Sequence, residues 1–292
     1  MKYALITQHK NTVPISLQCQ VLGVSRSCYY HYRRHTEGKS VDLEYQDMLE
    51  WVKKIAAESD DTYGSRRMKR AMNDQGYSIS RNKARRLMKE ANVPVRRRRK
   101  YKMTTNSHHK QPVFENLLQR QFDVTQPDQV YASDVTYIWT QEGWLYLAVV
   151  IDLCSRKIVG WSMSSRIKAQ LVCDALKMAI WQRRPKAGLI HHSDRGSQYA
   201  SKAFRQLLKA HGFKGSMSRK GDCWDNAVVE SFFGSLKQER VHWRHYQTRY
   251  GAQQDILNYL AVFYNNDRLH STLGYMSPAD YEKQLTEMKE AA

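Results

Sequence analysis

Two acidic residues mark the part of the sequence where chemistry is expected. Asp194 lies in HHSDRGSQYA and Glu230 in GDCWDNAVVESFFGSLKQE, with 35 residues between them. Asp134, far upstream in YASDVTYIWT, is the third acid that a fold can bring to them. Three converging carboxylates supply the oxygen ligands that magnesium or manganese prefers, and magnesium keeps waters that substrate phosphate can replace. The three acids therefore predict a metal site and metal-dependent phosphodiester chemistry on nucleic acid.

The distribution of charge also favours a nucleic-acid partner. The 292 residues include 47 Lys and Arg against 28 Asp and Glu, which gives a net charge of +19 and a pI near 9.7. From Thr62 to Lys110 there are 16 basic and 2 acidic residues, so +14 of the net charge lies there. A membrane partner is disfavoured because no long apolar run, signal peptide or basic amphipathic anchor is visible. We expect a cytoplasmic protein that reaches nucleoid DNA directly.

The cysteines are scattered and odd in number, so we expect them to be reduced rather than paired. They are Cys19, Cys28, Cys154, Cys173 and Cys223. A zinc cluster could be imagined from Cys19, Cys28, His31 and His35, but no C-x2-C pair exists and the flanking pattern is helical. We predict no zinc.

The first helical segment occupies residues 1–40. Pro14 to Arg34 predicts two short helices broken at Gly23, with Ser25 as the N-cap of the second. This is a helix-turn-helix pattern. The same apolar positions could close a helical hairpin that touches nothing, and the sequence leaves both interpretations open.

A second helical unit, with a basic linker, occupies residues 41–111. It begins with an amphipathic helix over about 43–58, followed by two basic helices separated at Gly76, the second starting at Ser80. Because acidic neighbours are almost absent, these helices and the linker are predicted to contact DNA phosphates. The expected DNA-contacting residues are Arg66, Arg67, Lys69, Arg70, Arg81, Lys83, Arg85, Arg86, Arg96, Arg97, Arg98, Arg99 and Lys100. His108 and His109 are interpreted as solvated linker residues.

The main domain is expected over residues 112–285, with a short tail at 286–292. Strands are predicted at 130–139, 144–152 and 157–163, and their short connections indicate an antiparallel meander. Period-2 alternation puts Asp134 on the same face as Ala132, Thr136 and Ile138. Burial of a carboxylate on such a face is costly unless it is paired or binds a metal, so Asp134 is a candidate for a functional role.

The rest of the domain alternates helices and short strands. Helices are predicted over 168–182 and 201–211, strands over 188–192 and 213–217, and a last helix from about 224 to 239. This order is that of a ribonuclease-H-like α/β fold, a mixed sheet flanked by helices. Ligands gather beyond the carboxyl ends of strands in such sheets, which is where Asp194 falls.

A helical wheel places Glu230 at the edge of the buried stripe of the last helix. Lys237, two turns later, shares its face and could bind substrate phosphate. Taken alone, Glu230 would be interpreted as an exposed glutamate paired with a nearby base such as Lys237. Three acids that all match one expected topology favour the site instead. Glu239, the chief rival acid, points about 180° away on the wheel.

Other residues near the expected site have plainer interpretations. Asp152 is interpreted as a turn or strand-end residue rather than a ligand. His191 and His192 could assist proton transfer, or they could pack and form hydrogen bonds near Asp194.

Five sequence blocks carry a resemblance to a known family. They are YASDVTYIWT, VIDLCSRKIVGW, HHSDRGSQYAS, GDCWDNAVVESFFGSLKQE and YNNDRLHSTLGYMSPADYE, and they cover nearly all of residues 125–285. They resemble the second-reading-frame transposases of the insertion-sequence-three family, whose core is similar to retroviral integrase. YGSRRMKR resembles the helix-turn-helix that precedes this core.

The resemblance implies a DDE transposase that cleaves transposon-end DNA and joins it to target DNA by in-line attack of a 3′-hydroxyl, without a covalent enzyme–DNA intermediate. It implies Asp134, Asp194 and Glu230 as the triad and as the ligands of two Mg²⁺ or Mn²⁺ ions, and Lys237 as a DNA contact. Expected partners are terminal inverted repeats, target DNA, further copies on DNA and an upstream-frame protein. The alternatives are a ribonuclease-H-type nuclease and a DNA-binding regulator with an inert core.

Overall fold

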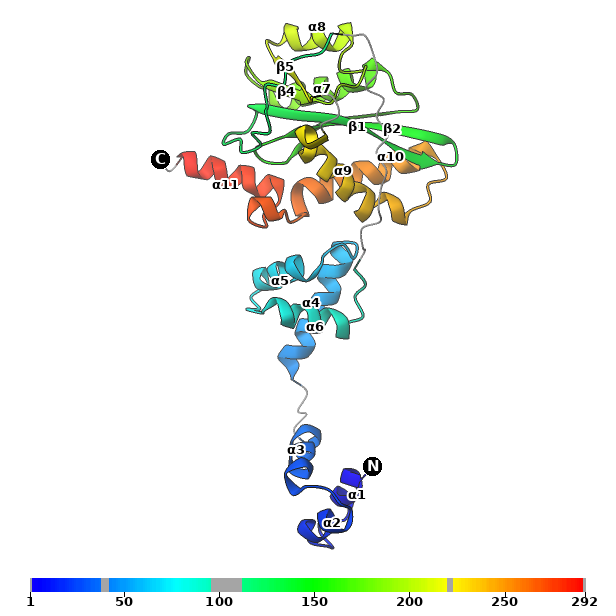
Figure 1. Cartoon of the computed structure of the whole chain (residues 1–292), viewed down its shortest axis with the longest axis vertical. Helices are drawn as coiled ribbons and strands as arrows, with labels where there is room; N and C mark the ends of the chain where they lie inside the picture. Colours follow the sequence, from blue (N-terminus) through cyan, green and yellow to red (C-terminus); the bar gives the residue numbers. More distant parts are fainter. Residues whose placement is uncertain (1, 38–41, 96–111, 220–222, 291–292) are drawn as a thin grey trace.

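The computed structural model describes residues 2–37, 42–95, 112–219 and 223–290. A small helical unit, a second helical unit and an α/β core follow one another along the long axis of the molecule (Figure 1). None of the helices in these ranges is long and apolar enough to cross a membrane.

The N-terminal unit consists of α1 (Lys2–Gln8), α2 (Ile15–Val21) and α3 (Arg26–Glu37). The Ser25 hydroxyl accepts a hydrogen bond from the Cys28 amide at 3.1 Å, which confirms the predicted N-cap. Ile6, Cys19 and Tyr29 form its small core, so Cys19 is a packing residue. Helix α1 was not expected from the sequence.

The second unit consists of α4 (Leu43–Glu58), α5 (Ser65–Asp74) and α6 (Arg81–Glu90). Ser80 caps α6 as predicted, accepting from the Lys83 amide at 3.1 Å. The apolar stripes of the three helices meet in one core that includes Val52, Met68, Met72, Leu87 and Met88. Below we call α4–α6 the basic module.

The core contains one mixed five-stranded sheet in the order β3-β2-β1-β4-β5. The strands are β1 (Val130–Thr140), β2 (Gly143–Asp152), β3 (Ile158–Ser164), β4 (Ile190–Ser193) and β5 (Lys214–Met217). The pairs β1–β2 and β2–β3 are antiparallel, whereas β1–β4 and β4–β5 are parallel. The predicted meander and ribonuclease-H-like order are confirmed.

Helices cover both faces of this sheet (Figure 1). One face packs against α7 (Ala169–Arg183) and α8 (Lys202–Ala210). The other packs against α9 (Ala227–Glu239), α10 (Arg249–Asn258) and the π-helix η3 (Tyr259–Asp267). The last helix, α11 (Pro278–Glu290), contacts η3 and runs past residue 285, where a tail was expected.

Helix α9 is held on the sheet by its apolar stripe. Val229, Phe232 and Leu236 are buried in the same cluster as Ala132 and Ile138 of β1. Each such side chain contributes about 1.5–3 kcal/mol on burial. Because α9 carries Glu230, this packing sets where that carboxylate lies relative to β1.

Candidate active site

The register of two parallel strands brings Asp134 beside Asp194. Ser133 of β1 is paired with Ser193 of β4, and this is the last pair between them. The next residues, Asp134 and Asp194, therefore leave the sheet side by side, at the end of two strands whose spacing across the sheet is about 4.8 Å. Each carboxylate is oriented locally: Oδ1 of Asp134 accepts from the Val135 amide at 2.7 Å, and Oδ1 of Asp194 accepts from the Gly196 amide at 2.9 Å.

Gly196 is a residue that the sequence analysis missed. A Cβ atom at this position would lie 2.9 Å from Oδ1 of Asp194, closer than real Cβ contacts allow. A side chain at this position would push on the Asp194 carboxylate, so the glycine leaves room for that carboxylate beside its own loop. The position of a glycine two residues after the acid was visible in the sequence, but its contact was not.

Glu230 completes an acidic neighbourhood. Burial raises the pKa of Asp134 well above its usual value, and the charges of Asp194 and Glu230 raise it further. Burial and Asp194 likewise raise the pKa of Glu230. The three acids feel one another's charge, although within the described ranges no three Asp, Glu, His or Cys side chains are arranged to hold a metal ion as they stand.

Lys237 faces the same neighbourhood. Its ammonium nitrogen lies 5.0 Å from the centroid of the Tyr137 ring, a cation–π distance. Burial lowers the pKa of Lys237 to about 8, against the opposing effect of the Asp134 charge. Lys237 is thus a buried cation beside Asp134 rather than an exposed one.

Two buried polar atoms near the acids find no hydrogen-bond partner among the residues described. One is the hydroxyl of Tyr199, whose pKa is raised by burial and then by the charges of Asp134 and Asp194. The other is Oδ1 of Asn226, whose Nδ2 donates to the Ser133 carbonyl at 3.4 Å. Buried polar atoms are normally satisfied, so a group that enters the site can bond to either: the Tyr199 hydroxyl can donate or accept, and Oδ1 of Asn226 can accept.

His191 and His192 are neutral hydrogen-bonding residues of β4. Nε2 of His191 lies 2.8 Å from the Ser133 hydroxyl, and Nδ1 of His192 lies 2.9 Å from the Ser216 hydroxyl. Burial lowers the pKa of His191 to about 3 and that of His192 to about 4. Of the two interpretations left open, hydrogen bonding between strands accounts for these side chains.

Asp225 fixes the segment that leads into α9. Its fully buried carboxylate accepts from the Asn116 amide group at 2.9 Å, from Nε of Arg120 at 3.1 Å and from the backbone amide of Arg219 at 2.9 Å. Burial alone would raise its pKa, but the Arg219 and Arg120 bonds outweigh that effect and lower it to about 2. Asp225 thereby ties the entry of the core and the β5 exit to the start of the Glu230 helix, a role with no local sequence signal.

The rival acids are engaged elsewhere. Asp152 accepts from the amides of Asp128 at 2.6 Å, Cys154 at 2.9 Å and Ser155 at 2.8 Å, so it is the turn residue that was predicted. Glu239 is buried at the far end of α9, where the Arg268 guanidinium donates to both its oxygens at 2.7 and 2.8 Å.

The predicted DNA contacts fall into different environments. Arg66, Arg70, Arg81, Arg85 and Arg86 are exposed, whereas Lys69 and Lys83 are half-buried. Arg67 is instead turned toward the core, 3.5 Å from Oε1 of Glu239. The linker residues Arg96, Arg97, Arg98, Arg99 and Lys100 lie outside the described residues.

Family models match three stretches of the chain. Residues 43–101 match an HTH-like domain, and residues 124–223 and 230–285 match integrase core domains. The chain is 40% identical over 285 residues to the transposase InsF for insertion sequence IS3A of Escherichia coli strain K12, covering 97% of this chain and 99% of that protein. The chain belongs to the IS3 family of transposases.

Another relative of this IS3-family transposase is an uncharacterized 31 kDa protein of insertion element IS600 from Shigella sonnei. It is 43% identical over 270 residues, covering 92% of this chain and 99% of that protein. Among solved structures, a simian T-cell lymphotropic virus intasome in complex with PP2A regulatory subunit B56 gamma matches with a TM-score of 0.46 and 13% identity, covering 78% of this chain and 73% of that one. The catalytic core domain of BIV integrase matches with a TM-score of 0.40 and 18% identity, covering 56% and 99%.

Proposed function

We propose that this IS3-family transposase uses Asp134, Asp194 and Glu230 as a DDE triad that cleaves transposon-end DNA and joins it to target DNA. The observation that carries the proposal is the β1–β4 register, which ends at Ser133 and Ser193 and so puts Asp134 beside Asp194. The charges of Asp194 and Glu230 both raise the pKa of Asp134, and that of Asp194 raises the pKa of Glu230, which supports the nearness of the third acid. Like charges gathered in a half-buried site destabilise a protein unless a cation offsets them, which is why such sites are candidates for function.

The donor chemistry of the three side chains suits one or two magnesium or manganese ions. The donor set is all carboxylate, as a hard divalent cation prefers, and the unpartnered Tyr199 hydroxyl and Asn226 Oδ1 could bond to its hydration waters. Asp134, Asp194 and Glu230 would be the ligands. When bound, the metal supplies Lewis-acid activation of the attacking oxygen and stabilises the leaving oxygen.

The chain's own groups hold the DNA and orient it. Lys237, beside Asp134, is placed to attract a phosphate at the reacting centre, since a desolvated cation interacts strongly with an anion. The attacking group is a water in cleavage and a DNA 3′-hydroxyl in joining, so no side chain forms a covalent bond to DNA.

Binding of the terminal repeats is assigned to residues 41–111, and catalysis to residues 112–285. Exposed arginines of α6 would contact phosphates and fix the register on the duplex. Residues 2–37 form a further helical unit, and α11 runs to Glu290. Two ends must be held together for transposition, so we propose an oligomer on DNA and an upstream-frame protein as fusion or partner.

The test is strand transfer of a labelled duplex made from the DNA that borders this coding sequence. Asp134→Asn, Asp194→Asn and Glu230→Gln should each abolish cleavage and joining, while Asp174→Asn, a change at an exposed acid of α7, should leave both intact. Undiminished joining by a triad variant would refute the site. Cleavage without joined products would favour the nuclease alternative.

A further inference from the structure

The basic module lies against the catalytic core at the far end of the Glu230 helix. Its contacts come from the α4–α5 turn and the first turn of α5. Asp60 accepts from Arg240, the residue that follows α9, at 2.9 Å. Arg67 of α5 lies 3.5 Å from Glu239 in the last turn of α9. These two contacts therefore fall on the last turn of the helix that carries Glu230 and on the residue that follows it.

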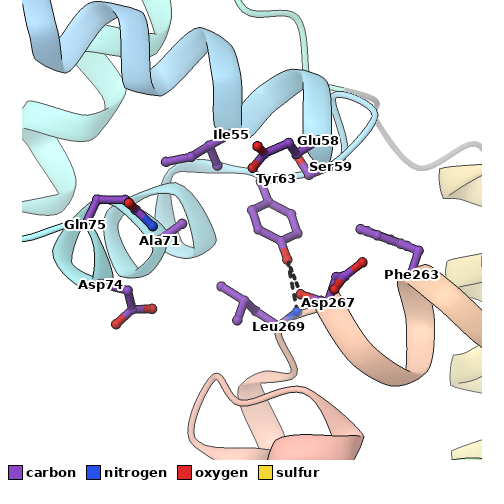
Figure 2. A pocket seen from close by; sticks show the side chains of 10 residues that line it. All are labelled: Ile55, Glu58, Ser59, Tyr63, Ala71, Asp74, Gln75, Phe263, Asp267 and Leu269. Atoms are coloured by element: carbon purple, nitrogen blue, oxygen red, sulfur yellow. Dashed lines mark hydrogen bonds between the residues drawn. The ribbon is translucent and has the colours of Figure 1, made fainter.

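Tyr63 makes the third contact, with the segment that follows η3. Its hydroxyl donates to the Asp267 carbonyl at 3.1 Å and accepts from the Leu269 amide at 3.0 Å (Figure 2). Phe263 of η3 and Leu269 pack against the apolar core of the module. The tyrosine is 6% exposed, so these bonds are shielded from water.

Arg67 belongs to a buried polar network rather than to the open surface. Glu239 lies between two guanidinium groups, that of Arg268 at 2.7 Å and that of Arg67 at 3.5 Å. The Arg67 guanidinium also stands 5.6 Å from the Tyr63 ring centroid. Burial, and then the charge of Arg268, lowers the pKa of Arg67.

These polar contacts hold the module on the core together with the packing of Phe263 and Leu269. A cavity of about 490 Å³ remains between module and core, lined by Ile55, Glu58, Tyr63, Phe263, Asp267 and other residues (Figure 2). Because this pocket is open to solvent, part of the junction is hydrated rather than close-packed. Loss of the polar contacts should therefore release the module.

We propose that Asp60, Tyr63 and Arg67 are positioning residues that dock the basic module on α9 and so fix the distance between the DNA bound by α6 and the reacting carboxylates. The docked face is the α4–α5 turn and one side of α5, while Arg81, Arg85 and Arg86 of α6 stay exposed. Docking and DNA binding thus use different faces of one module. On this proposal Arg67, which the sequence predicted as a DNA contact, binds the core instead of DNA.

Two neighbouring arginines provide a matched test. Arg66 and Arg67 are adjacent on α5, but only Arg67 faces the core. In duplex-binding titrations over a range of salt, Arg66→Gln should weaken binding and lower the salt slope by about one, as the loss of a phosphate contact does. Arg67→Gln should leave the slope unchanged. Equal losses of slope in both variants would overturn the proposal.

Release of the module is measured without DNA or catalysis. Small-angle scattering of the full chain should give a larger radius of gyration for Asp60→Asn/Tyr63→Phe/Arg67→Gln than for wild type, with the circular dichroism spectrum retained. Replacing Arg67 by Lys within the intact interface should preserve the wild-type radius. An unchanged radius in the triple variant refutes the docking role of these residues. A spectrum that shows loss of the module's helices refutes it too, because the three residues would then stabilise the fold of the module itself.

The consequence for cutting rests on the proposed transposase function. Wild type should cut the bordering DNA at one position, and the triple variant should spread its cuts over neighbouring nucleotides while retaining overall cleavage. A single unshifted position in the triple variant would refute the positioning role. If neither the wild type nor the variant cleaves the DNA, the proposed function fails. The salt slope and the scattering still test docking in that case, because neither depends on cleavage.

Discussion

Removal of the Glu239 charge should destabilise the protein far more than removal of an exposed glutamate. Glu239 accepts from Nε of Arg268 at 2.8 Å, from Nη2 of the same residue at 2.7 Å and from the Tyr259 hydroxyl at 2.7 Å. Glu239→Gln leaves the Arg268 guanidinium, 5% exposed, without its counter-charge. Breaking a buried pair in this way costs about 3–5 kcal/mol of the free energy of unfolding.

The assay is thermal unfolding at pH 7 followed by circular dichroism. For a domain of this size, that loss corresponds to a fall in Tm of roughly 6–20 °C. Glu287→Gln is the matched control, because Glu287 is exposed and lies 3.9 Å from Lys283 on the same helix. Its loss should be below about 0.5 kcal/mol. Equal shifts in the two variants would refute the assignment of Glu239 to a buried network.

The Glu239–Arg268 pair also predicts how the difference in stability between wild type and Glu239→Gln depends on pH. Burial opposes ionisation of Glu239, but Arg268 outweighs it and lowers the pKa of the carboxyl below its usual value. A lowered folded-state pKa gives stability that is complete above the unfolded pKa of about 4.3 and is lost as pH falls toward the folded pKa. The gap between wild type and Glu239→Gln should therefore narrow below about pH 4. A gap that widens on acidification would contradict this reasoning.

Three further outcomes are expected. Gly160→Ala should lower the free energy of unfolding by about 1–3 kcal/mol, measured in urea, because its Cβ would lie 2.2 Å from the Ala175 carbonyl oxygen; an unchanged midpoint would contradict the close β3–α7 packing. The pH–rate profile of cleavage should show no inflection near pH 6.5 from His191 or His192, whose pKa values lie near 3 and 4, and such an inflection lost in His192→Gln would overturn their structural role. Asp225→Asn should raise amide hydrogen exchange in the first turn of α9, since the carboxylate that binds Arg120 and Arg219 loses its charge; unchanged exchange there would remove its positioning role.

The sequence predicted the sheet and the face that carries Asp134 because strand alternation is a local signal. Ala132 and Ile138 are buried against α9, and Asp134 lies between them on that face, as the period-2 pattern indicated. The register of β1 with β4 could not be predicted from the sequence, because it pairs Ser133 with Ser193, 60 residues further along the chain. The approach of Asp134 to Asp194 could be expected, but not measured, from sequence.

Other features had no local signature. The segment Tyr259–Asp267 forms a π-helix, whose period matches neither an α-helix nor a strand, and the sequence analysis assigned no element there. Arg66 and Arg67 look alike in sequence, and only the distant Glu239 separates them. The wheel put Lys237 beside Glu230, but its burial against Tyr137 comes from the sheet. Such contacts join residues far apart in the chain, which periodicity does not register.

The most direct measurement of the proposed triad is calorimetric titration of Mn²⁺ into the full chain and into its three carboxylate variants. Wild type should bind the ion, and at a free concentration of 100 times Kd should be stabilised by about 2.7 kcal/mol. Asp134→Asn, Asp194→Asn and Glu230→Gln should each lose that binding while remaining folded. Wild-type affinity in all three variants would show that these carboxylates do not form the metal site.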